Sequence, residues 1–305
     1  MNLQQSRKTA LLNVFRGMGI GIANVIPGVS GGTIAAITGI YDNLVYCLGN
    51  FFKAGWRRSL AYLLPIVIGT LGGFFAFAGL VDIALELHAE QTLFFFIGLI
   101  LGSIPYLIKR AGELEFRARY LIPFVIALGL IVWMGLAERP PAGDPISTIR
   151  GINALIVIGG GALGSIAMVV PGLSGSFLLL LVGFYSTMTN AVRTLNAPVL
   201  ALFFIGTLAG LVIASKVVSW LLRNFHASSY YAIVGLVLGS VVGVWPGWSG
   251  GIEGLLSVGA GLIGLCLSLL LGTDVKERIR ARQAKRGADD PQTLSRSGKE
   301  GAADG

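Results

Sequence analysis

The sequence predicts an all-α polytopic membrane protein made of two repeats of inverted topology, each a broken, re-entrant-type helical hairpin followed by three transmembrane helices. Three observations lead to this prediction. The 305 residues have a mean hydropathy of +0.77 and only 12% charged side chains, so most of the chain cannot face water. Many apolar stretches are long enough to span or nearly span a bilayer. A Pro-Gly-x-Ser-Gly element occurs twice, at 27–31 and 171–175, each time between two of these stretches.

The apolar stretches divide into five in each half of the chain. They cover residues 11–26, 33–52, 60–81, 92–108 and 120–136, and then 152–170, 176–192, 198–222, 229–244 and 252–271. Because five is an odd number, the two halves are expected to face opposite ways across the membrane. The same conclusion holds if the first two stretches form a re-entrant hairpin, since the three remaining crossings are also odd in number.

The first stretch, 11–26, follows Arg7 and Lys8 as a secretory signal peptide would. Arg16 interrupts this stretch, and no small-residue cleavage site comes before the Pro-Gly element. We therefore expect it to stay in the mature protein as the first arm of a hairpin.

A helix break is predicted at each Pro-Gly pair, Pro27-Gly28 and Pro171-Gly172. Proline lacks a backbone donor and disfavours helical geometry at the residue before it, while glycine permits turns that other residues avoid. The first arm should therefore stop near Ile26. Such breaks can also be plain kinks, in which serine hydroxyls satisfy the freed backbone groups.

The helix that follows each break is expected to begin with unsatisfied N–H groups and the positive end of its dipole. Ser30 or Thr33 can cap the first of these helices. Two such starts that enter from opposite faces would form a pseudo-symmetric cradle for a phosphate or carboxylate. The candidate anion-binding residues are Ser30, Gly31, Gly32, Thr33, Ser174, Gly175 and Ser176.

An internal duplication supports the two-repeat prediction. A shift of 144 residues places Gly17 to Val45 on Gly161 to Thr189 with ten identities in 29 positions. A shift of 137 residues aligns Gly98 to Ser103 with Gly235 to Ser240. Repeats of opposite orientation with broken helices are common in secondary transporters, whose substrate sites lie near the bilayer midplane. Spaced glycine pairs are expected to serve helix packing in lipid; they are Gly17/Gly21, Gly69/Gly73, Gly98/Gly102 and Gly235/Gly239.

Charge placement predicts that both termini are cytoplasmic, because Lys and Arg concentrate in short cytoplasmic loops. The basic loops and the C-terminal tail fall on one side, and Asp82, Glu86 and Glu90 fall on the other. The expected organisation is a cytoplasmic N-terminus (1–9), a first membrane repeat (10–137), an extracytoplasmic linker (138–150), a second membrane repeat (151–272) and a basic, then disordered, cytoplasmic tail (273–305). The polybasic part of the tail is expected to bind anionic lipid headgroups.

Composition argues against several other kinds of site. The net charge of +8 gathers at segment ends and in the tail, which is not the footprint of a nucleic-acid-binding protein. Cys47 and Cys266 each lie alone in an apolar stretch, so the sequence indicates neither a disulfide nor a thiolate metal site. No cofactor is expected.

Ionisable residues inside apolar stretches are further candidates, because such groups usually face a bundle interior or a pathway. Arg16 and Lys216 could neutralise a bound anion, or could extend to the cytoplasmic interface instead. Asp42 follows the repeated Gly39-x-Tyr41 but corresponds to Ser186 in the second repeat. A role at a helix end is therefore favoured for Asp42 over a role in proton coupling.

An enzyme is the alternative class, because residues 28–32 match the G-x-S-x-G nucleophile elbow. A nucleophilic serine needs a base within hydrogen-bond reach. The two histidines, His88 and His226, are predicted on opposite faces of the membrane, and Ser176 breaks the elbow pattern in the second copy. Hydrolysis is disfavoured, although Lys216 stays open as a base.

The two motifs, in this order, resemble the PopT-like bacterial polyprenyl-phosphate transporter family, formerly described as an integral membrane domain of unknown function. The resemblance runs over about residues 10–271. It is carried by Gly17-x-x-x-Gly21-x-x-Asn24-x-x-Pro27-Gly28-Val29-Ser30-Gly31-Gly32-Thr33 with Gly39-Ile40-Tyr41, and by Pro171-Gly172-Leu173-Ser174-Gly175-Ser176-Phe177 with Gly183-x-Tyr185.

This resemblance implies a transporter in the bacterial plasma membrane that returns undecaprenyl phosphate, the lipid carrier for envelope glycans such as peptidoglycan, from the outer to the inner leaflet. The two Pro-Gly-x-Ser-Gly elements, which we call the first and second serine turns, would hold the phosphate while the polyprenyl tail stays in lipid. Asn24 stands where an acidic residue is expected in many relatives, so a carboxylate-based coupling scheme does not carry over directly. The sequence leaves open the driving force and a homodimer.

Overall fold

The computed structural model describes residues 7–25, 30–51, 53, 55–111, 117–137 and 144–272, and within these ranges the chain is helical and has no β-strand. The first half contains α1 (Arg7–Val25), α2 (Gly31–Ile37), α3 (Tyr41–Gly49), α4 (Trp56–Leu87), α5 (Ala89–Ala111), the short 3-10 helix η1 (Ala118–Tyr120) and α6 (Leu121–Leu136). The second half contains α7 (Asn153–Val169), α8 (Gly175–Leu181), α9 (Tyr185–Arg193), α10 (Ala197–Asn224), α11 (His226–Val244) and α12 (Gly251–Gly272).

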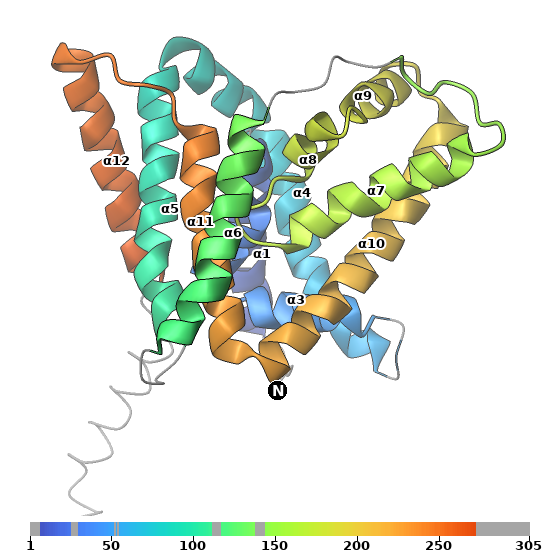
Figure 1. The fold of residues 1–305 in the computed structure, drawn as a ribbon, viewed down its shortest axis with the longest axis horizontal. Coiled ribbons are helices and arrows are strands. Elements are labelled where there is room, and N and C mark those ends of the chain that lie inside the picture. Colours follow the sequence, from blue (N-terminus) through green and yellow to red (C-terminus); the bar gives the residue numbers. More distant parts are fainter. Residues whose placement is uncertain are drawn as a thin grey trace, which may run out of the picture.

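The α-helices follow the same order in both halves, with α1 to α6 corresponding to α7 to α12. Figure 1 shows α5, α6, α11 and α12 standing upright side by side, and α7 and α10 slanting away from them. By length and composition, six helices of the described chain can cross a membrane, or seven if the bent pair α8 and α9 is one span. The protein is therefore a multi-pass membrane protein.

The ten predicted apolar stretches all fall on helices, but two of them are not single helices. The stretch 33–52 is divided into α2 and α3, and the stretch 176–192 into α8 and α9, which meet at an angle of 113°. These two breaks were not predicted from the sequence. Gly39 and Gly183 lie at these two breaks with the same φ of +71°, a left-handed conformation that glycine adopts without strain.

Glycines bring the long helices of each half into backbone contact. In the first half, a Cβ atom on Gly17 or Gly73 would overlap the backbone of the facing helix in the α1–α4 pair. In the second half, a Cβ on Gly161 or Gly206 would do the same between α7 and α10. The expected role of the glycine pairs in helix packing is therefore confirmed, and close backbone approach is what replaces hydrophobic driving force between helices in lipid.

The last helix of each half packs against the other half. A Cβ on Gly98 of α5 would overlap the carbonyl oxygen of Gly261 in α12, and a Cβ on Gly235 of α11 would overlap that of Phe124 in α6. The helices α5 and α11, which occupy equivalent places in the two halves, also pack against each other. These contacts between helices of different halves hold the two halves together.

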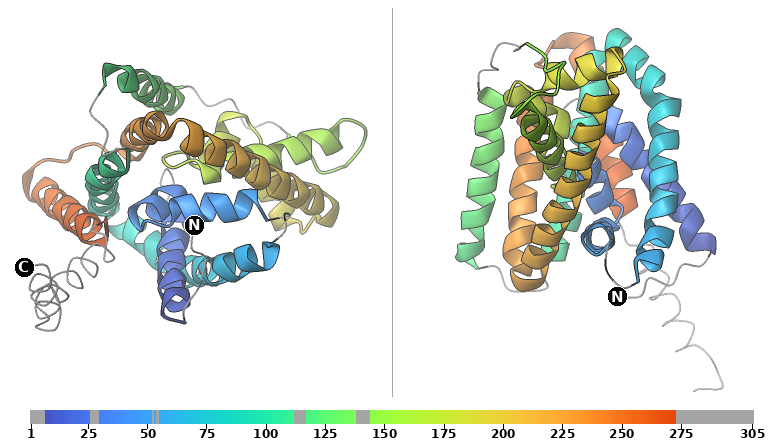
Figure 2. Two further views of the ribbon diagram at one scale, coloured as in Figure 1. Left: turned by 90° about the horizontal axis from the view of Figure 1, so that it is seen from below. Right: turned by 90° about the vertical axis from the view of Figure 1, so that its right-hand side faces the viewer.

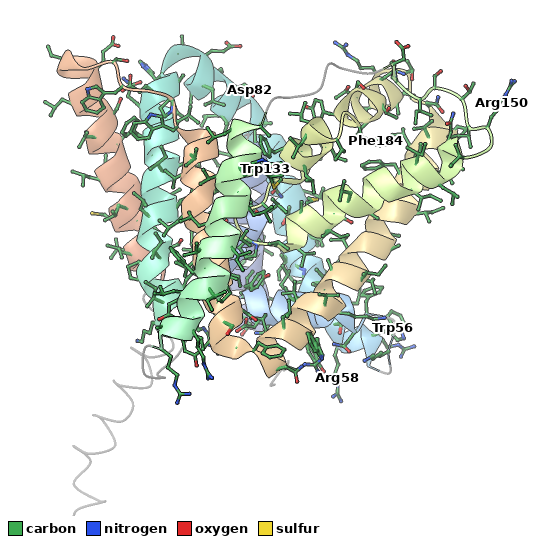
Figure 3. The ribbon with its side chains drawn as sticks, viewed as in Figure 1. Trp56, Arg58, Asp82, Trp133, Arg150 and Phe184 are labelled. Atoms are coloured by element: carbon green, nitrogen blue, oxygen red, sulfur yellow. The ribbon has the colours of Figure 1, made fainter. Side chains whose placement is uncertain are left out.

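Labelled side chains identify the two ends of the molecule. Figure 3 places Trp56 and Arg58, at the start of α4, at the lower end, and Asp82 and Arg150 at the upper end. The short helix α3 lies across the lower end and α9 lies near the upper end (Figure 1). We call these the α3 end and the α9 end. The expected segments 1–9, 138–150 and 273–305 lie partly or wholly outside the described residues.

Candidate functional site

In the first serine turn, the backbone N–H donors are hydrogen-bonded to acceptors in the first half of the chain. Ser30 is the N-cap of α2, and its Oγ accepts a hydrogen bond from the backbone N–H of Gly32 at 3.2 Å. The N–H of Thr33 donates to the carbonyl oxygen of Ser30 at 2.9 Å. The N–H of Gly31 donates to Oδ1 of Asn24 on α1 at 3.0 Å. The amide donors that start α2 are therefore satisfied within the chain, with the Asn24 side chain as an acceptor that an anion could replace.

The second serine turn leaves donors open. Ser174 is the N-cap of α8, its Oγ accepts from the N–H of Phe177 at 3.5 Å, and it lies 3.0 Å from the Oγ of Ser176. Within the described residues, the N–H groups of Gly175 and Ser176 have no acceptor. Ser174 and Gly175 are half-buried and Ser176 is exposed. These donors are accessible to a ligand from outside the chain.

The two serine turns meet. The backbone N–H of Gly172 donates to Oγ1 of Thr33 at 3.0 Å, and Oγ of Ser30 donates to the carbonyl oxygen of Val170 at 3.5 Å. A Cβ atom on Gly32 would lie 3.3 Å from Pro171, which is fully buried. The structure thus brings the predicted residues of both copies into one region, with Ser30 and Thr33 buried and the start of α8 more open.

Replacing Thr33 with valine should destabilise the contact between the turns. Thr33 is 2% exposed, so the substitution keeps the shape but leaves the buried N–H of Gly172 without an acceptor. We expect a loss of about 1–3 kcal/mol in stability, visible as a lower melting temperature of the purified protein. Thr70→Val is the matched control, because the Thr70 hydroxyl only donates to a carbonyl of its own helix. Equal melting temperatures for the two variants would refute this role of Thr33.

The charged candidates lie away from the serine turns. Arg16, on α1, donates from Nη1 to Oδ1 of Asn13 at 3.2 Å, about two turns of helix before Asn24. Lys216 is exposed on α10, where that helix passes Gly49 of α3. Asp42 is in the first turn of α3, and its Oδ1 accepts from the hydroxyl of Tyr230 at 2.7 Å.

Among the residues that the structure describes, no serine of the two turns is paired with a base. The hydroxyl of Ser30 donates to a carbonyl oxygen, and Ser174 is bonded to Ser176. The ring nitrogens of His226 lie within hydrogen-bond distance of the carbonyl oxygens of Leu222 and Arg110. In the described part of the chain, no group of three or more His, Cys, Asp and Glu side chains could hold a metal ion. The predicted breaking residues Pro27 and Gly28 lie outside that part.

Sequence reasoning missed one residue that shapes this site and did not anticipate the contact of another. Asn24 was a candidate charge partner, at a place where an acidic residue is expected in many relatives, and in the structure it accepts the first N–H of α2. Tyr41 donates from its hydroxyl to the carbonyl oxygen of Val169 at 3.0 Å, which joins the two halves beside the serine turns. Its repetition as Tyr185 in the second half was the signal that could have identified it.

Comparison with known proteins gives the family. A family model described as undecaprenyl phosphate translocase-like matches residues 20–258, well over half of the chain. The chain belongs to this family. The expected resemblance is thereby confirmed.

Curated relatives extend this family over most of the chain. A polyprenyl-phosphate transporter of Staphylococcus aureus is 31% identical over 271 residues, which are 86% of this chain and 95% of that protein. A polyprenyl-phosphate transporter of Vibrio cholerae is 34% identical over 251 residues, 77% of this chain and 78% of that protein.

A third relative matches a smaller part of the chain. The fluoride-specific ion channel FluC 2 of Corynebacterium jeikeium is 31% identical over 160 residues, 52% of this chain and 81% of that protein. No solved structure matches the chain. The undecaprenyl phosphate translocase-like family therefore covers far more of this protein than the channel does.

Proposed function

We propose that this protein is a transporter that moves undecaprenyl phosphate, or a similar polyprenyl phosphate, from the outer to the inner leaflet of the bacterial plasma membrane. One observation carries the proposal: serine turns from the two halves are joined by a hydrogen bond from Gly172 to Thr33, in a family whose relatives are named polyprenyl-phosphate transporters. The phosphate would bind at these turns while the polyprenyl chain remains in lipid.

The phosphate-binding role of the turns has a physical basis. Backbone N–H groups and the positive end of a helix dipole attract a phosphate. The phosphate would first bind the open donors of Gly175 and Ser176. A phosphate oxygen can then replace the Asn24 carbonyl at the N–H of Gly31. In this scheme Ser30, Gly32, Thr33 and Ser174 complete the site, and Arg16 and Lys216, which lie away from the turns, supply positive charge only at longer range.

Movement between the leaflets would come from inverted repeats that rock against each other. The position of α3 and α9 at opposite ends of the molecule supports this arrangement. The basic residues near the α3 end, such as Arg58, support a cytoplasmic location of that end and of both termini. The transported lipid requires no covalent step.

Reconstitution tests the proposed function. Purified protein in vesicles that contain labelled undecaprenyl phosphate should exchange the label between leaflets and leave it chemically unchanged. Release of inorganic phosphate would instead show a lipid-phosphate hydrolase, which is the alternative class. Vesicles loaded with fluoride provide a further comparison, and we expect them to keep their fluoride despite the likeness to a channel.

Serine substitutions test the site within the same assay. Ser30→Ala and Ser174→Ala each remove a hydroxyl that accepts a backbone N–H of the following helix. We expect each change to slow leaflet exchange about tenfold, since a hydrogen bond to a charged group contributes about 1.5–3 kcal/mol. The rate is measured at matched protein level. Ser257→Ala is the control, because this hydroxyl donates to a carbonyl of its own helix α12. Unchanged exchange in both serine variants would leave only backbone donors in the proposal.

A further inference from the structure

The two hairpins are packed very differently although their sequences correspond. Tyr41 at the start of α3 is 3% exposed, whereas Tyr185, its counterpart at the start of α9, is 39% exposed. None of the residues of α3 is exposed, and α3 contacts both α4 of its own half and α10 of the other. Figure 2 shows α3 nearly end-on among these helices in its right-hand view. The α3 end is thus closed by contacts that the α9 end lacks.

A hydrogen bond between the halves holds α3 in place. Oδ1 of Asp42 accepts from the hydroxyl of Tyr230 on α11 at 2.7 Å, and Tyr230 is 3% exposed. Arg110 of α5 lies across a small cavity of about 10 Å³ from Asp42, with its Nε donating to the hydroxyl of Tyr106 at 3.2 Å. Such a cavity has room for about one water molecule. The contact of α3 with α5 and α11 is therefore polar and charged.

Buried hydroxyls lie on the other side of α3. A Cβ atom on Gly49 would lie 3.2 Å from the backbone nitrogen of Lys216 and the carbonyl carbon of Ser215 in α10. Ser215 and Ser219 are 0% and 8% exposed, and among the described residues neither Oγ has a hydrogen-bond partner. Leaving a buried hydroxyl without a partner is costly, and water would satisfy both groups if α3 moved away.

We propose that the contact of α3 with α10 and α11 is a gate that opens to water, held shut by the hydrogen bond from Tyr230 to Asp42. A half-buried carboxylate and a tyrosine hydroxyl lie on one side of α3, and two buried serine hydroxyls lie on its other side, so water could solvate polar groups on both sides if α3 moved away. Tyr230 and Asp42 are positioning residues in this proposal. The gate rests on the proposed function, because it would be a moving part of the transport cycle. Its test uses no lipid substrate, so the gate can be refuted without refuting the transport function.

The test is the accessibility of Ser215. A Ser215→Cys variant is made in a protein that carries Cys47→Ala and Cys266→Ala, and its labelling by a hydrophilic maleimide is followed over time. Tyr230→Phe should raise the labelling rate about tenfold, since it removes a hydrogen bond to a charged group. Tyr231→Phe, the same deletion at a ring that stacks on Tyr120, should leave the rate unchanged.

Three further variants test the gate against loosening of the whole protein. Ser268→Cys is an equally buried reporter, whose native hydroxyl is also unpartnered, in the α5–α12 contact that Gly102 closes. It should stay unlabelled in the Tyr230→Phe background. Asp42→Asn keeps an oxygen acceptor and should raise Ser215→Cys labelling less than Asp42→Ala. The proposal is overturned if Tyr230→Phe leaves the Ser215→Cys rate unchanged, or if Ser268→Cys labelling rises by the same factor.

Discussion

Replacing Gly172 with alanine is expected to cause a large loss of stability, because both the backbone conformation and the packing at this position oppose a side chain. Gly172 has a φ of +82°, and the left-handed conformation costs a residue with a Cβ about 1–2 kcal/mol. That Cβ would also lie 2.6 Å from the carbonyl carbon and oxygen of Leu236 in α11, where the backbone cannot yield easily. Overpacking adds about 1–3 kcal/mol, so a total of about 3 kcal/mol is expected.

The measurement is the melting temperature and yield of the purified Gly172→Ala protein beside Gly159→Ala. Gly159 is an exposed helical glycine of α7 with no atom within 4 Å of an added Cβ, so its substitution should be neutral or stabilising by up to about 1 kcal/mol. Equal melting temperatures of the two variants would show that the packing described for the second serine turn is wrong.

A disulfide between α3 and α10 is expected to stop transport. Gly49→Cys and Ser215→Cys introduce thiols at a point where a Cβ on residue 49 would lie 3.2 Å from the carbonyl carbon of residue 215, and formation of the disulfide is verified by mass. With Cys47 and Cys266 replaced by alanine, oxidation should join the first hairpin to the second half. Leaflet exchange should fall at least about tenfold, because the transport cycle needs this contact to open. A tenfold change corresponds to about 1.4 kcal/mol.

Reduction should restore exchange in the same vesicles, and neither single-cysteine variant should respond to oxidant. Those controls separate a locked gate from damage by the substitutions themselves. Full exchange through protein in which the disulfide is shown by mass to be complete would mean that α3 and α10 do not separate during transport.

Periodicity and composition predicted much of this fold. The apolar stretches coincide with helices because their length and hydropathy are local properties. The spaced glycine pairs, predicted to serve helix packing, lie in the close α1–α4, α5–α12 and α6–α11 contacts. The serine at the start of α2 was predicted as a cap, since Ser30 follows a Pro-Gly pair and precedes an apolar run.

Other features depend on contacts between residues far apart in the sequence. The hydrogen bonds of Tyr230 with Asp42 and of Gly172 with Thr33 join positions more than a hundred residues apart, and no spacing rule indicates such partners. The breaks at Gly39 and Gly183 were missed because an isolated glycine is common inside membrane helices. Its repetition in both halves was the available clue.

The most direct test of the central claim is protection of a thiol at the second serine turn. Ser176 is exposed beside the open donors of α8, so Ser176→Cys, with Cys47 and Cys266 replaced by alanine, should react with a small hydrophilic thiol reagent. Undecaprenyl phosphate should slow this reaction in a saturable way, and undecaprenol, which has the same chain without the phosphate, should not. Equal labelling with both lipids would contradict the account, because the headgroup would then bind elsewhere.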